Sequence, residues 1–164
     1  MKLPTLDLQS SPLQEGLGDP YLRLRLSDNV PVALPMAAAR EVLVMSMEQI
    51  TPIPNMPACV LGLLNQRSRV IWVVDLSIML GYVGFTANTR QFNIVIFQVD
   101  QVPLGLAVPI VQGIARFPLE TIQSPIGTVA SNIAPYLRGC LPDEREVLLV
   151  LDPDAIINAS ILQR

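Results

Sequence analysis

The sequence predicts a mainly β protein built from two small β-barrels that share apolar packing. Hydrophobic residues make up 51% of the 164 residues and charged residues only 15%, so the chain has enough apolar surface to bury a core. Fifteen prolines and nine glycines interrupt it every few residues, which keeps the elements short and favours strands over long helices. A strand, an aspartate and a short helix follow one another twice, so about ten strands divide into two similar halves.

The N-terminal residues 1–19 are rich in Ser, Pro and Gly, and we predict a flexible tail there. The folded domain, with its two barrel subdomains, is predicted over residues 20–164. It begins with Tyr21–Leu26, where leucines alternate with arginines as in a half-buried strand. After this strand we predict, in order, a turn at Ser27–Asn29 and strands at Val30–Pro35 and Glu41–Met45.

The next segment carries the first of the two strand–aspartate–helix patterns. Pro57 has the fixed φ that suits the first position of a helix, so a short helix is predicted over Ala58–Leu64. Val70–Val74 is an uninterrupted apolar strand. Asp75 then fits the N-cap of a helix over Leu76–Leu80, which the following glycine ends.

The second half ends with the same pattern. A hairpin is predicted from strands at Phe92–Val99 and Val102–Val108, which the turn Asp100–Gln101 connects. Glu146–Leu151 is the last strand, and Asp152 caps the helix that follows it. The remaining predicted elements are strands at Val111–Phe117 and Leu137–Leu141, a loop over residues 121–135, and a helix with Pro153 at its first position that continues over Ala155–Leu162.

Composition excludes most kinds of catalytic site. The chain has no histidine, so it has no imidazole base, no Ser-His-Asp unit and no His-ligated zinc. Lys2 is the only lysine and the acidic residues are scattered, which favours a binding protein without cofactor or metal over an enzyme. Two alternatives remain: an enzyme that uses Asp75 or Asp100 as acid or base, and a β-barrel sensor that binds a small molecule.

Charge and cysteine content bound the partners and the compartment. The net charge is −3 and no basic run is long enough to follow a phosphate backbone, so nucleic acid is not an expected partner. Cys59 and Cys140 lie far apart, which predicts buried thiols without a disulfide in a reducing compartment. Because no apolar stretch is long enough to cross a bilayer and the start lacks a secretory signal, we expect a soluble cytoplasmic protein without direct membrane insertion.

Several long stretches carry no charge, among them residues 49–66 and 102–115. They form either a partner-binding surface or the cores of the two barrels, and composition does not decide between the two. Arg67 follows the first stretch and is predicted to protrude at a tight connection. A planar guanidinium beside apolar surface suits a binding hot spot, although a solvated turn is the commoner setting for such a residue. Trp72 fits either a core or an interface.

Two motifs near the middle of the chain are the most specific. Gly62-Leu63-Leu64-Asn65-Gln66-Arg67 matches a Gly-x-x-Asn-x-Arg-Gly pattern, and Val70–Leu76 matches a Pro-x-Val-Asp-Leu pattern. Further matching motifs are Arg40–Leu43, Ile50–Pro57, Gly105–Val108, Tyr136–Gly139 and Leu151–Asp152. In their order and spacing, over residues 20–162, these motifs resemble the CheW-like adaptor family of bacterial chemosensory systems.

The resemblance implies two five-stranded, SH3-like β-barrels packed together, with short helices. It also implies a non-catalytic adaptor or scaffold that couples chemoreceptors to a CheA-type histidine kinase in the control of chemotaxis, twitching motility or phototaxis. One subdomain would bind the regulatory domain of the kinase, and a groove between the barrels would take the cytoplasmic tip of a methyl-accepting chemoreceptor. By position, Ala39, Glu41, Val42 and Arg67 become candidates for receptor contact or signal transmission, and Asn65 for holding the shape of the connection.

Three residues depart from the family pattern. Ser68 replaces the usual Gly after the arginine, Trp72 stands where Pro is common, and Pro109 stands where Asp is frequent. If the backbone of Ser68 has a positive φ, it is strained in a way that glycine avoids, so the loop that holds Arg67 is predicted to differ in shape. A divergent receptor or kinase partner is consistent with these changes.

Overall fold

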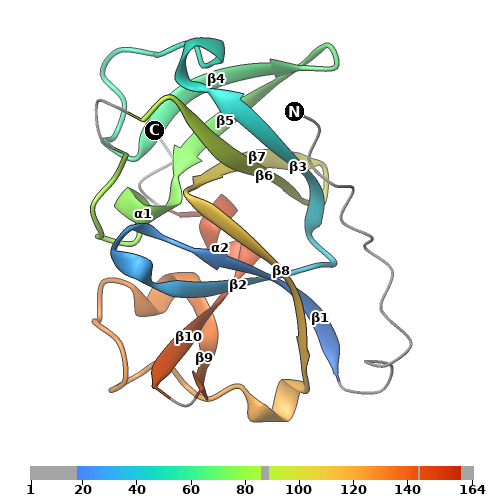
Figure 1. Ribbon diagram of the computed structural model, residues 1–164, viewed down its shortest axis with the longest axis vertical. Helices are drawn as coiled ribbons and strands as arrows, with labels where there is room; N and C mark the ends of the chain where they lie inside the picture. The colour runs from blue at the N-terminus through green and yellow to red at the C-terminus, as the bar shows by residue number, and fades with distance from the viewer. Residues whose placement is uncertain (1–17, 86–88, 144, 160–164) are drawn as a thin grey trace.

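The computed structural model describes residues 18–85, 89–143 and 145–159, which form ten strands in two five-stranded sheets (Figure 1). This confirms the prediction of a mainly β fold with two small units and few short helices. Residues 1–17 of the predicted tail lie outside the described residues. The strands are β1 Asp19–Arg25, β2 Pro31–Pro35, β3 Ala39–Ser46, β4 Val60–Gln66, β5 Arg69–Asp75, β6 Gln91–Val99, β7 Val102–Val108, β8 Ile110–Phe117, β9 Leu137–Asp143 and β10 Glu146–Leu151.

Short helices connect some of these strands. The α-helices are α1 Leu76–Met79 and α2 Pro153–Ile157, and the 3-10 helices are η2 Ser27–Asn29, η3 Met47–Gln49, η4 Leu119–Thr121 and η5 Ala134–Tyr136. Nine of the ten strands were predicted to within three residues at each end, as were the turn at Ser27–Asn29 and the hairpin of β6 and β7.

The two sheets have the same topology, but the chain enters it at different points. One sheet has the strand order β8-β1-β2-β10-β9, and the other has the order β3-β6-β7-β5-β4. In each, one neighbouring pair is parallel, β2 with β10 and β5 with β7, and the other pairs are antiparallel. The series β8, β9, β10, β1, β2 therefore corresponds to β3, β4, β5, β6, β7, which makes the sheets circular permutations of each other. The two units are similar, as predicted, but they are not the two halves of the sequence.

A matching contact closes each sheet into a barrel. After β3 the chain crosses to edge strand β4, where Thr51 and Leu63 exchange two backbone hydrogen bonds of 2.8 and 2.9 Å. Gln123 and Cys140 do the same between the segment after β8 and strand β9, also at 2.8 and 2.9 Å. We call the unit of β1, β2 and β8–β10 barrel A and the unit of β3–β7 barrel B. Barrel B is uppermost in Figure 1.

A glycine directly precedes the closing residue of each edge strand. A Cβ atom on Gly62, whose φ is +144°, would lie 2.1 Å from the carbonyl oxygen of Thr51. A Cβ atom on Gly139 would lie 2.3 Å from the carbonyl oxygen of Gln123. Neither position has space for a side chain, so barrel closure requires glycine in both of these sequence motifs.

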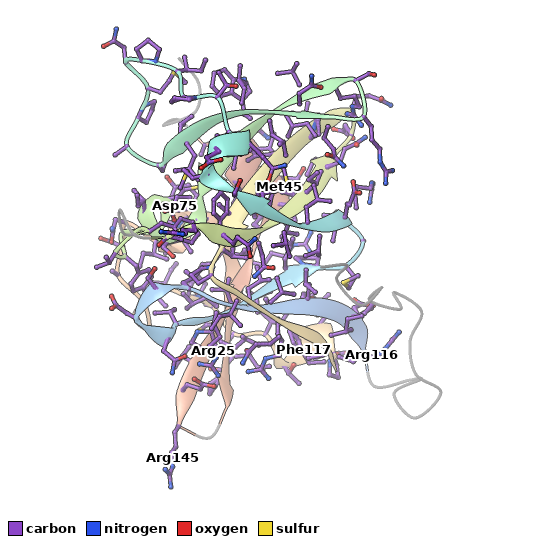
Figure 2. The ribbon with its side chains drawn as sticks, turned by 45° about the horizontal axis from the view of Figure 1, so that its top comes forward. Arg25, Met45, Asp75, Arg116, Phe117 and Arg145 are labelled. Atoms are coloured by element: carbon purple, nitrogen blue, oxygen red, sulfur yellow. The ribbon has the colours of Figure 1, made fainter. Side chains whose placement is uncertain are left out.

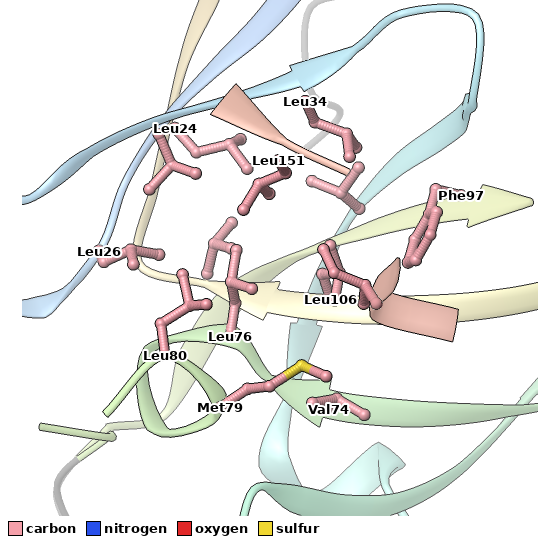
Figure 3. Packing of buried hydrophobic residues seen from close by; sticks show 14 of the residues in the cluster. Leu24, Leu26, Leu34, Val74, Leu76, Met79, Leu80, Phe97, Leu106 and Leu151 are labelled. Carbon is pink, nitrogen blue, oxygen red and sulfur yellow. The ribbon is translucent and has the colours of Figure 1, made fainter. Parts of the chain in front are cut away.

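Three apolar clusters hold the molecule together, one inside each barrel and one between them. Figure 3 shows part of the cluster between the barrels. Successive residues of a strand go to different clusters: Val73 lies inside barrel B and Val74 lies between the barrels. Because both faces of such strands are buried, they read as uninterrupted apolar runs. Part of the uncharged stretch over residues 102–115 is buried in the core, since Leu104 and Leu106 belong to the cluster between the barrels.

The predicted helix over Ala58–Leu64 is wrong, because Ala58 and Cys59 lie in a turn and strand β4 begins at Val60. It pairs antiparallel with β5, with a bulge between Val60 and Gly62. Leu64 belongs to the cluster inside barrel B, and Val60 packs on the cluster between the barrels. A short apolar run has no periodicity that separates a helix from a strand buried on both faces, and here pairing with a neighbouring strand decides the structure.

Both predicted aspartate caps are confirmed. Asp75 accepts a hydrogen bond from the backbone N–H of Ile78 at 3.3 Å, and Asp152 accepts from Asp154 and Ala155 at 3.1 and 3.3 Å. The last helix is shorter than predicted. It ends at Ile157 because the next residue, Asn158, leaves the helical conformation with φ −92° and ψ 11°. Residues 160–164, the end of the predicted helix, lie outside the described residues.

An ion pair ties β1 to β10 on either side of β2. Both terminal nitrogens of Arg25 donate to the carboxylate of Glu146, each at 2.7 Å, and Nη2 of Arg23 lies 3.9 Å from the same carboxylate. The hydrogen bonds from Arg25, together with the charges of both arginines, hold the pKa of Glu146 below its ordinary value of 4.5. A carboxyl whose pKa is lower in the folded than in the unfolded state stabilises the fold above the unfolded pKa.

We therefore expect Glu146→Gln to make the free energy of unfolding depend less steeply on pH in the acid range. The free energy of unfolding of the wild type should fall as the pH drops below 4.5 and through the lowered pKa of Glu146, and part of this fall should be absent from the variant. Urea titrations at several pH values measure the effect. Glu120→Gln, at an exposed position of η4, is the control and should leave the slope of the wild type unchanged. Parallel curves for wild type and Glu146→Gln would refute the assignment.

Candidate functional site

The connection predicted to present Arg67 is a two-residue turn between β4 and β5. Gln66 and Arg69 form the last pair of the hairpin, and Arg67 and Ser68 between them have φ values of 53° and 64°. Two successive positive φ values are typical of the tight turns that match the twist of a hairpin. The side chain of Arg67 is 77% exposed, so it protrudes as predicted, although from a hairpin and not from the end of a helix.

The positive φ at Ser68 predicts that Ser68→Gly stabilises the protein. A left-handed backbone is unfavourable for serine, and removing that strain should add about 0.5–1 kcal/mol to the free energy of unfolding. Urea denaturation measures the change. Ser131→Gly is the matched control, because Ser131 is also exposed but does not have a positive φ, and it should be neutral or destabilising. A loss of stability in Ser68→Gly would contradict the argument.

Glu41 faces Arg67 across the end of barrel B. A bulge in β3 places Arg40 as an extra residue between Ala39 and Glu41, so that Glu41 pairs with Ile96 on the interior face of the barrel. Its Oε2 atom lies 3.1 Å from Nη2 of Arg67, and its side chain is 26% exposed. The structure therefore joins two of the sequence-predicted residues in one ion pair at the mouth of barrel B.

The other three predicted residues lie around this pair without joining it. Ala39 is buried in the cluster between the barrels, and Val42 is half-buried and packs on the same cluster. Asn65 is exposed on β4, where it pairs with Val70 two residues before the turn. Ala39 and Val42 thus connect β3 to the contact between the barrels, whereas Arg67 and Asn65 are open to a partner.

Sequence reasoning left Trp72 undecided, and the structure places it on an apolar surface of barrel B. Trp72 is 40% exposed and Val70 64% exposed, on the face of β5 that points away from the barrel interior. Leu63 of β4 pairs with Trp72. The parallel register of β5 and β7, extended back along both strands, brings the exposed Val102 to the Val70 end. We call Leu63, Val70, Trp72 and Val102 the apolar strip.

The apolar strip continues the cluster between the barrels out to the surface. Val74 of β5 and Leu104 of β7 share the face of the strip but lie under barrel A. The strip also ends beside the turn that carries Arg67. An uncharged apolar surface bordered by an exposed arginine is typical of a protein–protein interface, because apolar area can be desolvated without leaving charges unpaired. The alternation within an uninterrupted apolar strand was not enough to predict this surface.

Of the two aspartates considered as acid or base, Asp75 and Asp100, Asp75 has structural hydrogen bonds. Both carboxylate oxygens accept backbone hydrogen bonds, Oδ1 from Ile78 at 3.3 Å and Oδ2 from Phe85 at 3.2 Å. Burial raises the pKa of this carboxyl above its ordinary value, and the backbone hydrogen bonds act in the opposite direction. Cys59 is also buried, which raises the pKa of its thiol. Within the described residues, no three metal-ligating side chains cluster and no helix is long and apolar enough to span a membrane.

Comparison with known proteins agrees with this arrangement. The family model described as a CheW-like domain matches residues 20–160. The chain belongs to the CheW-like family. This membership confirms the resemblance predicted from the motifs and makes the protein an adaptor of chemotaxis-type signal transduction.

Two CheW relatives and one CheW crystal structure illustrate how far the similarity extends. The chemotaxis protein CheW of Rhizobium meliloti is 33% identical over 107 residues, which cover 65% of this chain and 68% of the relative. The chemotaxis protein CheW of Treponema pallidum is 25% identical over 124 residues, or 74% of this chain and 73% of the relative. The crystal structure of the scaffolding protein TtCheW from Thermoanaerobacter tengcongensis has a TM-score of 0.71 at 21% identity, covering 82% of this chain and 89% of that chain. It therefore shares the fold of two barrels.

Proposed function

We propose that this protein is a non-catalytic adaptor that binds the regulatory domain of a CheA-type histidine kinase and couples it to the cytoplasmic tip of a methyl-accepting chemoreceptor. The observation that carries the proposal is the apolar strip of barrel B beside the Arg67–Glu41 ion pair, in a chain that belongs to the CheW-like family. The protein works by contact, since it transmits a conformational free energy and not a chemical group. It acts in the cytoplasm, at the membrane-bound arrays of the receptors.

The apolar strip is the surface that we assign to the kinase. Val70 and Trp72 lie on the outer face of barrel B beside Leu63 and Val102, and this uncharged surface suits the apolar face of a folded domain. Trp72 has the size and shape of an interface anchor, because a large ring buries much area at a small cost in conformational entropy.

The Arg67–Glu41 pair is the element that we assign to signal transmission. Arg67 is open to a partner, whereas Glu41 belongs to β3, whose Val42 and Ala39 reach the cluster between the barrels. A change at the turn therefore has a short packed route to the place where the barrels meet. Because receptor and kinase must both act on this route, each is expected to change the response of the protein to the other.

Calorimetry with the isolated regulatory domain of the kinase tests the proposal. We expect the wild type to bind and Trp72→Glu to bind at least about a hundredfold more weakly, because a buried carboxylate replaces a central aromatic anchor. Val83→Glu is the matched control: Val83 is 62% exposed but follows α1 at the other end of β5, and binding should be retained. If the wild type binds no CheA-type kinase, the proposed function fails. If Trp72→Glu binds as the wild type does, the kinase docks elsewhere.

A further inference from the structure

Apart from Tyr21 and the two cysteines, Asp75 and Ser77 are the only polar side chains among the described residues that are almost completely buried, each 1% exposed. Figure 2 shows Asp75 where barrel B approaches barrel A. Both residues belong to one short segment, the end of β5 and the start of α1. Buried polar groups are retained only where hydrogen bonds compensate for lost hydration, so the partners of these two side chains show what they hold in place.

The carboxylate of Asp75 holds both ends of the segment that contains α1. One oxygen accepts from Ile78 within the helix, and the other accepts from Phe85 beyond it. The contact with the returning chain is close, because a Cβ atom on Gly84 would lie 2.9 Å from Oδ2 of Asp75. Phe85 then packs against Phe92, with the ring centres 4.9 Å apart, at the cluster inside barrel B. The carboxylate of Asp75 and the packing of Phe85 thus fix the segment to barrel B.

The same segment is in direct contact with barrel A. The hydroxyl of Ser77 accepts a hydrogen bond of 3.2 Å from the backbone N–H of Ser27, in the turn between β1 and β2. Leu76, Met79 and Leu80 all lie in the cluster between the barrels, together with Leu26, the residue just before that turn (Figure 3). Helix α1 is therefore a wedge that belongs to barrel B and lies against barrel A.

We infer that Asp75 and Ser77 are positioning residues that set how the two barrels sit on each other. Strand β5 runs from the Arg67 turn to Asp75, so it connects the proposed partner-binding end of barrel B to the wedge. The inference rests on the proposed function in one respect: movement of the wedge is a second route, beside the one through β3, by which binding at barrel B changes the position of barrel A. We call the contacts of Asp75 and Ser77 the latch.

Barrel A offers a matched control for the latch. Asp152 caps α2 as Asp75 caps α1, and the two helices follow the corresponding strands β10 and β5. The carboxylate of Asp152, however, is only half-buried, and its hydrogen bonds with other described residues come from the first turn of its own helix. Asp75→Asn and Asp152→Asn therefore both weaken a helix cap, but only the first removes a contact of the latch. Asparagine keeps one carbonyl oxygen and loses the second acceptor.

Hydrogen exchange of the free protein tests the latch without any partner. Asp75→Asn should raise the exchange rates of the Ser27 and Phe85 amides by about tenfold or more, whereas Asp152→Asn should leave both unchanged. Ser77→Ala removes only the acceptor for Ser27, so it should raise the rate at Ser27 alone, and it keeps the test open if Asp75→Asn does not fold. Unchanged exchange at Ser27 in both latch variants would overturn the inference.

Reconstitution with receptor and kinase tests the route. Asp75→Asn and Ser77→Ala should keep the Kd for the kinase regulatory domain within about threefold of the wild type, yet lower the receptor-dependent rate of kinase autophosphorylation by about fivefold or more. Asp152→Asn should keep both binding and response. A full response in the latch variants, or a loss that Asp152→Asn shares, would overturn the role of the latch in transmission. A wild type that binds no kinase overturns the proposed function instead, and the exchange rates then decide whether the latch exists.

Discussion

Gly62→Ala should lower the free energy of unfolding by more than about 3 kcal/mol, because it combines backbone strain with a clash that the barrel cannot relieve. The φ of +144° is unfavourable for any residue with a side chain, and the added Cβ would lie 2.1 Å from the carbonyl oxygen of Thr51. That oxygen accepts the hydrogen bond from Leu63 that closes barrel B, so it cannot move away without opening the barrel. Urea denaturation followed by tryptophan fluorescence measures the loss, since Trp72 lies on the neighbouring strand.

Substitutions at two further glycines measure the backbone strain and the steric clash separately. Gly113 has a φ of +120° but open space around it, so Gly113→Ala isolates the backbone strain and should cost about 1–2 kcal/mol. Gly139 has no positive φ, but its Cβ would lie 2.3 Å from the carbonyl oxygen of Gln123, so Gly139→Ala isolates the clash in the corresponding place of barrel A. Both single effects should be smaller than that of Gly62→Ala. If Gly62→Ala were no worse than Gly113→Ala, the close approach of Thr51 would not be what requires glycine.

Arg67→Glu should abolish most of the receptor-dependent activation of the kinase while it leaves the fold intact. An exposed ion pair contributes at most about 1 kcal/mol to stability, so the change in the free energy of unfolding should be small. The variant places a second carboxylate beside Glu41, where the arginine nitrogen now lies 3.1 Å away. We expect activation to fall by about tenfold or more, with binding of the kinase regulatory domain kept within about threefold. The rate of autophosphorylation with receptor present is the readout.

Arg145→Glu is the control for the reversed charge. Arg145 is exposed in the turn between β9 and β10, which corresponds to the Arg67 turn and lies at the far end of barrel A (Figure 2). It should leave activation unchanged. The double variant Arg67→Glu with Glu41→Arg restores an ion pair, but it still presents the wrong charge to a partner, so activation should stay low. Full recovery in the double variant would mean that the ion pair, and not contact by Arg67, is what matters.

Most elements could be predicted from the sequence because their local signals agree with the fold. Tyr21–Leu26 alternates as a strand with a solvent-facing side does, and Asp75 and Asp152 cap their helices through local backbone N–H groups. The helix predicted over Ala58–Leu64 failed for a physical reason. In a strand with apolar residues on both faces, the periodicity that distinguishes strand from helix is absent, and the pairing partner is distant in the sequence.

The arrangement of the strands needed the structure. The sequence pattern showed two similar units, but pairing between β1 and β8 and between β2 and β10 joins the two ends of the chain in one barrel. No local signal reports such pairing. The site, too, could be predicted only in part. The exposure of Arg67 follows from a tight polar connection, whereas its pairing with Glu41 depends on closure of barrel B. Trp72 is exposed because barrel A covers Val74 on the same face of β5 but does not extend over Trp72, and the sequence alone does not report this packing.

Reconstitution of receptor, kinase and this protein tests the central claim most directly, that the protein couples the other two by contact. The measurement is the rate of kinase autophosphorylation with membrane-embedded receptor, with and without the protein, before and after addition of the receptor's ligand. We expect the protein to raise the rate by about tenfold or more only when receptor is present, and the ligand to change that rate. A rate that is the same with and without the protein, under conditions where calorimetry shows the kinase to be bound, would contradict the claim.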